Sequence, residues 1–306
     1  MQETFISAIT DATQSRLLNV ENLFSNQGLQ DSFKVIFFDI SLGSLENFIP
    51  LSDSRVIKKS SPNEAANYEK FKNASFSDYI PDIFGSKDTQ ESTEIEIKNA
   101  LEGFIKPSVM DCKLGVRAYL QDFSGSSDDV LRTDLYEILL KETPHLLTSA
   151  DNQIKAIKKS KFLKLRGENS TMESHGFRIS GVKFYDEEKI YKEIRNNRDE
   201  DEIKVMIKRF LSNRKDIAEK YLNLLRVLKV KLESNDLFYR CECIGSSLLL
   251  IHDNKQVGVW MIDFNRIKEH SNLYISHYEK WDGSNCEDGF LLGLDNFIKI
   301  LEASVP

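Results

Sequence analysis

Two apolar segments far apart in this chain carry acidic side chains where strands would end, and this pairing limits the possible folds most strongly. The first, residues 107–115, reads Pro-Ser-Val-Met-Asp-Cys-Lys-Leu-Gly, and the second, residues 259–264, reads Val-Trp-Met-Ile-Asp-Phe. Asp111 and Lys113 are two residues apart, so a strand would place both side chains on one face. Asp263 follows four apolar residues, where a carboxylate is costly unless it is paired or binds a cation. We expect Asp111 and Asp263 on opposite walls of one crevice, where one carboxylate could act as a base and the other as a metal ligand.

Composition narrows the class of protein. A chain of 306 residues with 41% hydrophobic content can bury a substantial core, as one two-lobed domain or two small domains that close over a cleft. The net charge of -7 argues against general nucleic-acid binding. No stretch approaches the roughly 18 apolar residues of a membrane-spanning helix, so we expect a soluble protein of the cytoplasm or nucleus. The four cysteines lack C-x-x-C spacing, which favours reduced thiols over disulfides or a structural zinc site.

The first third of the chain reads as a small lobe. Residues 1–30 are expected to form an N-terminal arm or helix. Alternating apolar residues predict strands over 33–39, 54–58 and 93–98, with a turn around Gly43. Ser61 and Pro62 are typical of a helix start and predict a helix to residue 71. Residues 31–99 would then form a lobe of strands and one helix.

Residues 100–306 would form a larger lobe of mixed helices and strands, so the fold class is α+β. Strands are predicted over 109–113, 177–185, 238–251 and 256–264. Helices are predicted over 128–141, within 201–232 as one long amphipathic helix, and over 287–301. The charged residues 186–202 are expected to be a solvated linker.

Four segments resemble those of one enzyme family. Residues 107–115 match the P-x-x-x-D-x-K-x-G signature of the inositol polyphosphate kinases, and residues 259–264 resemble the family's I-D-F metal-binding segment. Residues 244–253 resemble its G-S-S-L-L segment, and residues 287–294 resemble its E-D-G-Y-L-x-G-L run. The similarity extends from about residue 56 to 301 and is greatest to the inositol 1,4,5-trisphosphate 3-kinases. It implies a two-lobed kinase-like fold with a helical, inositol phosphate-binding insert at about residues 128–168.

The resemblance also implies a nucleotide site that uses ATP and Mg²⁺. Lys58 would hold the ATP phosphates, with Glu64 positioning Lys58. Asp263 would bind magnesium with help from Ser246. The resemblance places further ATP-binding residues at Glu96, Ile97 and Asn99.

The acceptor side follows from the same resemblance. Asp111 would orient or deprotonate the attacking hydroxyl, while Lys113 offsets charge on the phosphates. The residues that would bind the substrate phosphates are Lys113, Arg117, Lys159, Arg166 and Lys183. Because the chain has the long insert of the 3-kinases, we expect it to phosphorylate the 3-hydroxyl of inositol 1,4,5-trisphosphate, giving the 1,3,4,5-tetrakisphosphate.

Two alternatives stay open. One is a kinase with another acceptor, such as a multikinase or a hexakisphosphate kinase; the other is a non-catalytic inositol phosphate-binding protein. Five residues depart from the family pattern: Asn99 replaces an aspartate, Asn265 a glycine, Leu165 a tryptophan, Gly167 an acidic residue and Cys286 an arginine. Arg16 is the only basic residue within 1–30, so no calmodulin site is expected, and we expect a monomer.

Overall fold

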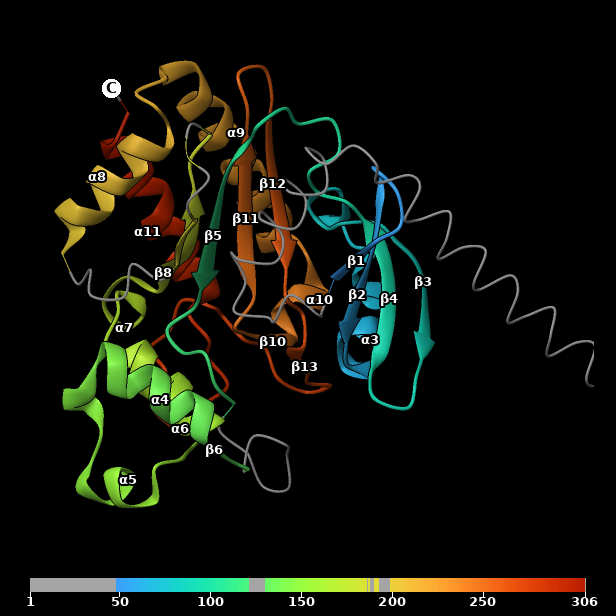
Figure 1. Ribbon diagram of the computed structural model, residues 1–306. Helices are drawn as coiled ribbons and strands as arrows, with labels where there is room; N and C mark the ends of the chain where they lie inside the picture. The colour runs from blue at the N-terminus through green and yellow to red at the C-terminus, as the bar shows by residue number, and fades with distance from the viewer. Residues whose placement is uncertain (1–47, 121–129, 186, 188–189, 193–198, 306) are drawn as a thin grey trace, which may run out of the picture.

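The computed structural model describes residues 48–120, 130–185, 187, 190–192 and 199–305. The expected arm over 1–30, the strand over 33–39 and the turn at Gly43 lie outside these residues. The described chain folds into two lobes that lie side by side, with the small lobe at the right of Figure 1. None of the helices in the described chain is long and apolar enough to cross a membrane.

The small lobe is a four-stranded antiparallel sheet in the order β1-β2-β4-β3, with one helix packed against it. Its elements are β1 (Phe48–Pro50), β2 (Arg55–Ser60), α3 (Pro62–Phe71), the short 3-10 helix η2 (Ser77–Tyr79), β3 (Ile83–Asp88) and β4 (Thr93–Lys98). The Ser61 hydroxyl accepts a hydrogen bond from the Glu64 backbone N–H at 3.2 Å, and Pro62 is the first helical residue, so the predicted helix is confirmed. In β4, Ile95 and Ile97 are buried on one face as the alternation predicted.

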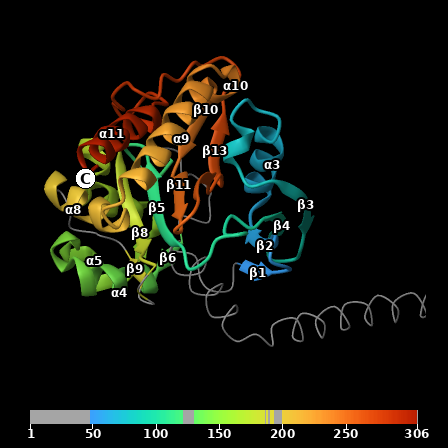
Figure 2. The ribbon, with the colours of Figure 1, turned by 90° about the horizontal axis from the view of Figure 1, so that it is seen from above.

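The large lobe is built on a five-stranded antiparallel sheet in the order β12-β11-β5-β8-β9. Its strands are β5 (Ser108–Leu114), β8 (Phe177–Lys183), β9 (Ile190–Lys192), β11 (Ser247–His252) and β12 (Val257–Ile262). Three helices cover one face: α8 (Glu200–Phe210), α9 (Lys215–Glu233) and α11 (Phe290–Ala303), as Figures 1 and 2 show.

The other face of this sheet is turned toward the small lobe. On β5, Met110 and Cys112 join the core under the helices, while Val109 and Asp111 line a pocket between the lobes. Because both faces are covered, all seven residues of β5 are buried. The sheet therefore presents a row of buried side chains to the interlobe space.

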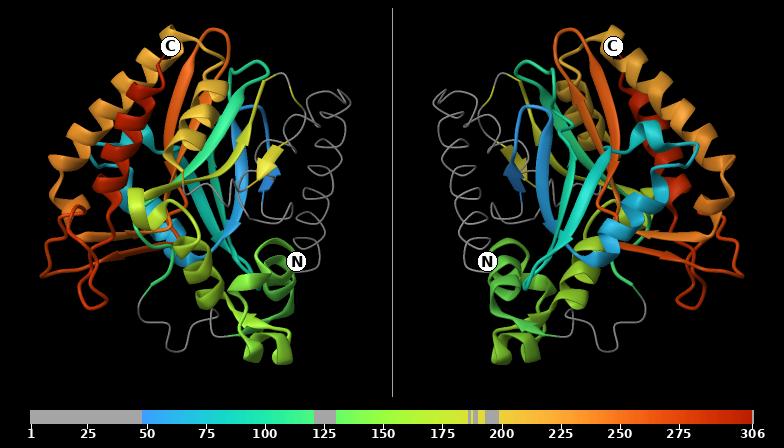
Figure 3. Two further views of the ribbon diagram at one scale, coloured as in Figure 1. Left: turned by 90° about the vertical axis from the view of Figure 1, so that its left-hand side faces the viewer. Right: turned by 90° about the vertical axis from the view of Figure 1, so that its right-hand side faces the viewer.

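A group of short elements extends from one end of the large lobe, at the bottom of Figures 1 and 3. It contains β6 (Leu131–Arg132), α4 (Thr133–Glu142), the 3-10 helix η4 (Pro144–Leu146), α5 (Ser149–Ile154), β7 (Ile157–Lys158) and α6 (Lys159–Glu168). The helix α7 (Met172–His175) joins the group to β8. These elements share a small core of their own, formed by Tyr136, Leu139, Leu147, Ile157 and Phe162. We call residues 131–168 the insert.

Three helix predictions were wrong in their bounds. The last helix, expected over 287–301, is α11, which begins at Phe290 and ends at Ala303. The helix expected from residue 128 begins at Thr133, because Leu131 and Arg132 instead pair with β7. The long helix expected within 201–232 is two helices, α8 and α9. Ser212 and Asn213 between them have φ angles of 51° and 55°, and two successive left-handed residues end an α-helix. The apolar stripe continues in both helices, so periodicity alone did not reveal the break.

The strand expected over 238–251 is three elements: α10 (Asp236–Tyr239), β10 (Cys241–Ile244) and β11. Gly245, with φ of 71°, separates the two strands. As a result β10 leaves the main sheet and pairs with β13 (Arg266–Glu269), a strand that was not predicted. The supposed linker over 186–202 was also partly wrong, since it includes β9 and the start of α8.

The first testable prediction concerns the contact between α11 and the turn before β8. A methyl group added at Gly293 would overlap the carbonyl oxygen of Gly176, and would approach the Gly115 nitrogen to 3.3 Å. That carbonyl accepts the Gly115 N–H at 2.7 Å, immediately after β5. We expect Gly293→Ala to lower the free energy of unfolding by about 1–3 kcal/mol or more, measured by urea denaturation.

Gly167→Ala is the matched control. Gly167 lies in helix α6, and the atom nearest to an added methyl group is the Met172 sulfur at 3.9 Å. The control should be neutral or stabilising by about 0.5–1 kcal/mol, because alanine favours a helix over glycine. Equal effects of the two substitutions would contradict the close packing at Gly293.

Candidate active site

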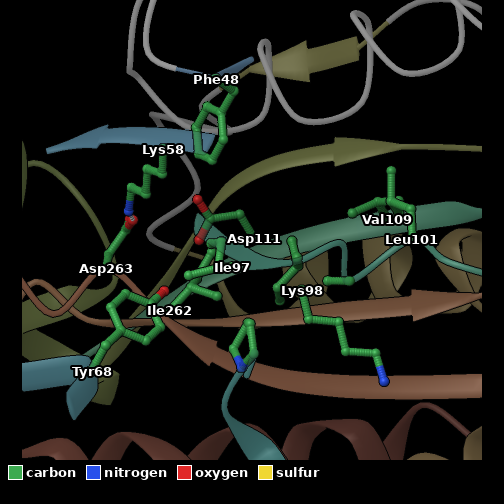
Figure 4. A pocket seen from close by; sticks show the side chains of 13 residues that line it. Phe48, Lys58, Tyr68, Ile97, Lys98, Leu101, Val109, Asp111, Ile262 and Asp263 are labelled. Carbon is green, nitrogen blue, oxygen red and sulfur yellow. Dashed lines mark hydrogen bonds and ion pairs between the residues drawn. The ribbon is translucent and has the colours of Figure 1, made fainter. Parts of the chain in front are cut away.

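A pocket of about 550 Å³, part of it open to solvent, lies between the two lobes. Figure 4 shows Lys58, Asp111 and Asp263 near one end of it, and Leu101, Lys98 and Val109 toward the other. Most of the remaining lining is apolar: Phe48, Tyr68, Pro81, Ile97, Ala100, Leu249 and Ile262. The pocket thus has a charged end and a largely apolar end, a combination typical of ligand sites.

Lys58, from β2 of the small lobe, lies between two carboxylates. Its Nζ is 2.7 Å from Glu64 Oε1 and 2.9 Å from Asp263 Oδ1. Burial lowers the pKa of Lys58, but Glu64 and Asp263 outweigh it and raise the pKa well above its ordinary value. Glu64 Oε1 also accepts the Phe264 N–H at 3.0 Å, so the helix α3 and the end of β12 are joined here. Lys58 is therefore charged, and its ammonium group is fixed where the small lobe meets the large lobe.

Asp263 is the centre of this charged group. Burial raises the pKa of its carboxyl, but Lys58 and then Lys113 outweigh burial and hold the pKa well below its usual range. Lys113 Nζ is 3.2 Å from Asp263 Oδ2 and donates to the Ser247 hydroxyl at 2.9 Å. The φ angle of Asp263 is 67°, in the left-handed region that few residues other than glycine adopt. The backbone therefore turns at Asp263, the residue whose carboxylate pairs with both lysines.

The turn after Asp263 is tied to the small lobe. The Ser61 hydroxyl donates to Asn265 Oδ1 at 2.5 Å, and Asn63 Nδ2 donates to the Asn265 carbonyl at 2.7 Å. The buried Asn67 amide donates to the Phe264 carbonyl at 2.9 Å. Asn265, which replaces a family glycine, is therefore accommodated by hydrogen bonds to α3, and the left-handed residue is Asp263 instead.

Asp111 is fully buried in the middle of β5. Neither of its carboxylate oxygens accepts a hydrogen bond of ordinary geometry from the residues that the structure describes. Burial raises the pKa of Asp111, as does Asp263, while Lys113, a looser contact with the Ser247 hydroxyl and Arg178 oppose the shift. A buried carboxylate with open acceptor positions and a raised pKa is suited to accepting a proton.

The expectation that Asp111 and Asp263 occupy opposite walls is wrong. Both come from the large-lobe sheet, because β11 lies between β5 and β12 and pairs Leu249 with Asp111 on one side and with Trp260 on the other. The facing wall is supplied by the small lobe, from which Lys58 reaches across to Asp263. One pocket nevertheless contains both carboxylates.

The donor atoms at this end fit a hard divalent cation. Such ions take oxygen ligands, and magnesium usually binds one or two carboxylates and completes its shell with ligand phosphates and water. Asp263 offers two carboxylate oxygens, and Ser246 offers a hydroxyl that here donates to the Asp263 carbonyl at 3.3 Å. With so few protein oxygens, a cation at this site would depend on oxygens brought by the ligand.

The remaining residues predicted for the nucleotide lie along β4 and the segment after it. Ile97 lines the pocket, whereas the Glu96 carboxylate pairs with Arg55 at 2.8 Å. Asn99 is buried, donates to the Asp53 carbonyl at 2.6 Å and accepts from the Leu101 N–H at 3.0 Å. Both ends of the Asn99 side-chain amide are thus hydrogen-bonded to backbone groups, at the point where the chain passes from the small lobe to the large lobe.

The predicted phosphate-binding residues other than Lys113 lie in three places. Arg117 is buried after β5, pairs with Glu242 at 2.5 Å and stacks over Trp281 at 4.9 Å. Lys183 lies at the end of β8, where it pairs in register with Val109. In the insert, Lys159 begins α6, and the Arg166 guanidinium near the end of the same helix lies 4.9 Å from the Phe162 ring centre.

Sequence reasoning did not single out Arg178. It lies on β8 opposite Lys113, and burial lowers the pKa of its guanidinium to about 10, while Asp111 raises it. A charged residue between the apolar neighbours Phe177 and Ile179, inside a predicted strand, was the signal that could have found it. Arg178 adds a second cation beside the buried Asp111.

Comparison with known proteins is consistent with this geometry. The family model described as inositol polyphosphate kinase matches residues 94–302, more than half of the chain. Rat inositol-trisphosphate 3-kinase A is 33% identical over 226 residues, which are 72% of this chain and 49% of that protein. Human inositol-trisphosphate 3-kinase B is 30% identical over 88% of this chain and 29% of its own. The chain thus spans about half the length, or less, of these two relatives.

Solved structures support the fold. The inositol phosphate multikinase of Saccharomyces cerevisiae, solved with ADP and Mn²⁺, superposes with a TM-score of 0.54 at 16% identity, over 82% of this chain and 98% of that one. A second multikinase structure gives a TM-score of 0.51 at 22% identity, over 78% and 98%. The expected two-lobed α+β fold is confirmed. From its sequence match and its fold together, the chain belongs to the inositol polyphosphate kinase family.

Proposed function

We propose that this protein is an ATP-dependent kinase that phosphorylates the 3-hydroxyl of inositol 1,4,5-trisphosphate. The observation that carries the proposal is the buried Asp111 in one interlobe pocket with Lys58 and Asp263, whose carboxylate also pairs with Lys113. The relatives named as trisphosphate 3-kinases support this acceptor, since they match 72% or more of the chain. The long insert supports it as well.

The two ends of the pocket suit the two parts of ATP. The adenine ring would pack against apolar residues such as Ile97 and Leu249, while the phosphates would extend toward Lys58. On binding, phosphate oxygens would replace Asp263 as partners of Lys58, and Glu64 would keep the lysine in place. Asp263 and Ser246 would hold Mg²⁺, which when bound neutralises charge on the transferred phosphoryl group.

The residues of β5 act on the acceptor. Asp111 would take the hydroxyl proton, because its raised pKa makes it a better base than an exposed aspartate. Lys113 and Arg178 would offset the charge that develops around the transferred group. Lys159 and Arg166, which the insert supplies, would hold the other phosphates of the ring and so select the hydroxyl that faces ATP.

The test is to incubate the protein with ATP, Mg²⁺ and a panel of inositol phosphates, and to locate the new phosphate on the ring by NMR. We expect turnover of the 1,4,5-trisphosphate, with the phosphate on the 3-hydroxyl. Phosphorylation at other positions, or of more heavily phosphorylated rings at equal rates, would indicate a multikinase or hexakisphosphate kinase. ATP turnover that stays at background with every acceptor would indicate a non-catalytic inositol phosphate-binding protein.

A further inference from the structure

Three ligating side chains meet at a second place in the large lobe, and none of them lines the interlobe pocket. A carboxylate oxygen of Glu242, a ring nitrogen of His270 and the sulfur of Cys286 lie within 4.8 Å of one another. Among the residues that the structure describes, this is the one such group of three or more histidine, cysteine or acidic side chains. We call it the Glu-His-Cys cluster.

The fold brings the three side chains from separate segments. Glu242 on β10 pairs in register with Lys268 on β13, and the His270 N–H donates to the Arg240 carbonyl at 2.8 Å. Glu242 and His270 are thus diagonal neighbours on one face of the β10-β13 ladder, with His270 Nε2 3.1 Å from Glu242 Oε2. Cys286 comes from the loop before α11.

That loop is held in place by its own neighbours. The Glu287 carboxylate accepts the backbone N–H groups of Ser276 and His277, each at 2.8 Å. Cys286 is half-buried, whereas the other three cysteines of the chain are buried. Its thiol is therefore the accessible one, and it is positioned next to the ladder.

Glu242 is held from the opposite side. It is 5% exposed, and its Oε1 is 2.5 Å from the buried Arg117 guanidinium, while Oε2 is the atom that faces His270. A carboxylate with one oxygen fixed by an arginine and the other directed into a ligand group resembles a metal ligand that is oriented by a neighbouring residue. Arg117 also limits the affinity, because its charge and that of Lys268 repel a cation.

We propose that the Glu-His-Cys cluster binds Zn²⁺ through Glu242 Oε2, His270 and Cys286, with the fourth position open to water. Imidazole and thiolate ligands favour zinc over magnesium, which prefers oxygen. Zinc bonds of roughly 2.0–2.3 Å require ligand atoms roughly 3.3–3.8 Å apart, so binding would slightly widen the 3.1 Å distance between His270 Nε2 and Glu242 Oε2 and draw in any ligand pair that lies nearer the 4.8 Å limit. The thiol proton of Cys286 is released on binding, and the two anionic ligands balance the ion's charge.

The experiment is a Zn²⁺ titration of the chelator-treated full chain in the presence of excess Mg²⁺, followed by calorimetry. We expect one Zn²⁺ per chain, accompanied by proton release. Co²⁺ in its place should give a thiolate-to-cobalt charge-transfer band. Cys286→Ser and His270→Gln should each weaken Zn²⁺ binding at least about tenfold and Cys286→Ser should abolish the band. His145→Gln, an exposed histidine in the insert, is the matched control and should bind Zn²⁺ as the parent does.

Thermal unfolding separates loss of the ligand from loss of the fold. Without metal, Cys286→Ser should unfold at the temperature of the parent, because its side chain is only half-buried. Zn²⁺ should raise the unfolding temperature of the parent and not that of the variant. Equal Zn²⁺ affinity of the parent and Cys286→Ser, or no binding by the parent at micromolar Zn²⁺, would overturn the proposal. Neither result would bear on the kinase activity, which is assayed separately.

Discussion

Asp263→Asn should lower kcat by at least about 10³-fold. The substitution removes a magnesium ligand, and a bound metal ion supplies several kcal/mol of transition-state stabilisation, each 1.4 kcal/mol being a factor of ten. It also removes the shared partner of Lys58 and Lys113, at 2.9 and 3.2 Å. Transfer of radiolabelled phosphate from ATP to the trisphosphate measures the effect, and KM for ATP should rise with it.

The same variant should be less stable than the parent at neutral pH. The pKa of Asp263 is lower in the folded protein than in the unfolded chain, so its contribution is present above the unfolded pKa of about 3.9 and is lost as the pH falls. Asp216→Asn, at an exposed ion pair with Arg214, is the control and should leave both the turnover rate and the free energy of unfolding close to those of the parent. Activity of Asp263→Asn within tenfold of the parent would remove Asp263 from the mechanism.

Asp111→Asn should lower kcat by about 10²- to 10⁴-fold with little change in KM for ATP, because the amide cannot accept the hydroxyl proton. Its effect on stability should have the opposite sign to that of Asp263→Asn. Burial raises the pKa of Asp111, so the folded state is penalised as the pH rises from the unfolded pKa of about 3.9 through the raised folded pKa. At neutral pH the asparagine variant should be as stable as the parent or more stable.

Steady-state kinetics and urea denaturation of the same preparations separate a catalytic role from a structural one. A residue that only supports the fold would lose activity and stability together. Asp111→Asn should instead combine low turnover with undiminished stability. A variant that is both inactive and markedly less stable would show that the buried carboxylate supports the fold, and the assignment of Asp111 as the base would fail.

Much of the fold was predictable because its signals are local. The helix α3 follows from Ser61 and Pro62, and β4 follows from alternating isoleucines. The bounds that were wrong depend on contacts with distant residues or on backbone angles. The strand β6 exists because β7 pairs with it, and the α8–α9 break depends on the left-handed angles of Ser212 and Asn213.

The candidate site was predictable only in part. Asp111, Lys113, Lys58 and Asp263 were found from strand-end charges and a family resemblance. The structure brings Asp111, Lys58 and Asp263 to one pocket, and Lys113 pairs with Asp263 there. How these side chains are arranged around the pocket was not predicted. The strand order of the large-lobe sheet puts the carboxylates of Asp111 and Asp263 on one wall of the pocket. The two segments that carry them are about 150 residues apart, and this spacing does not reveal that β11 lies between β5 and β12.

The sequence by itself determined which residues could do chemistry, because a charge inside an apolar strand is costly and is therefore visible as a break in the pattern. Tertiary structure alone decided how those charges pair. Lys58 joins Asp263 across 205 residues of chain, and Arg117 joins Glu242 across 125. Such partners are selected by sheet order, register and the approach of the two lobes, all of which are set by packing of the whole core and not by any local run of residues.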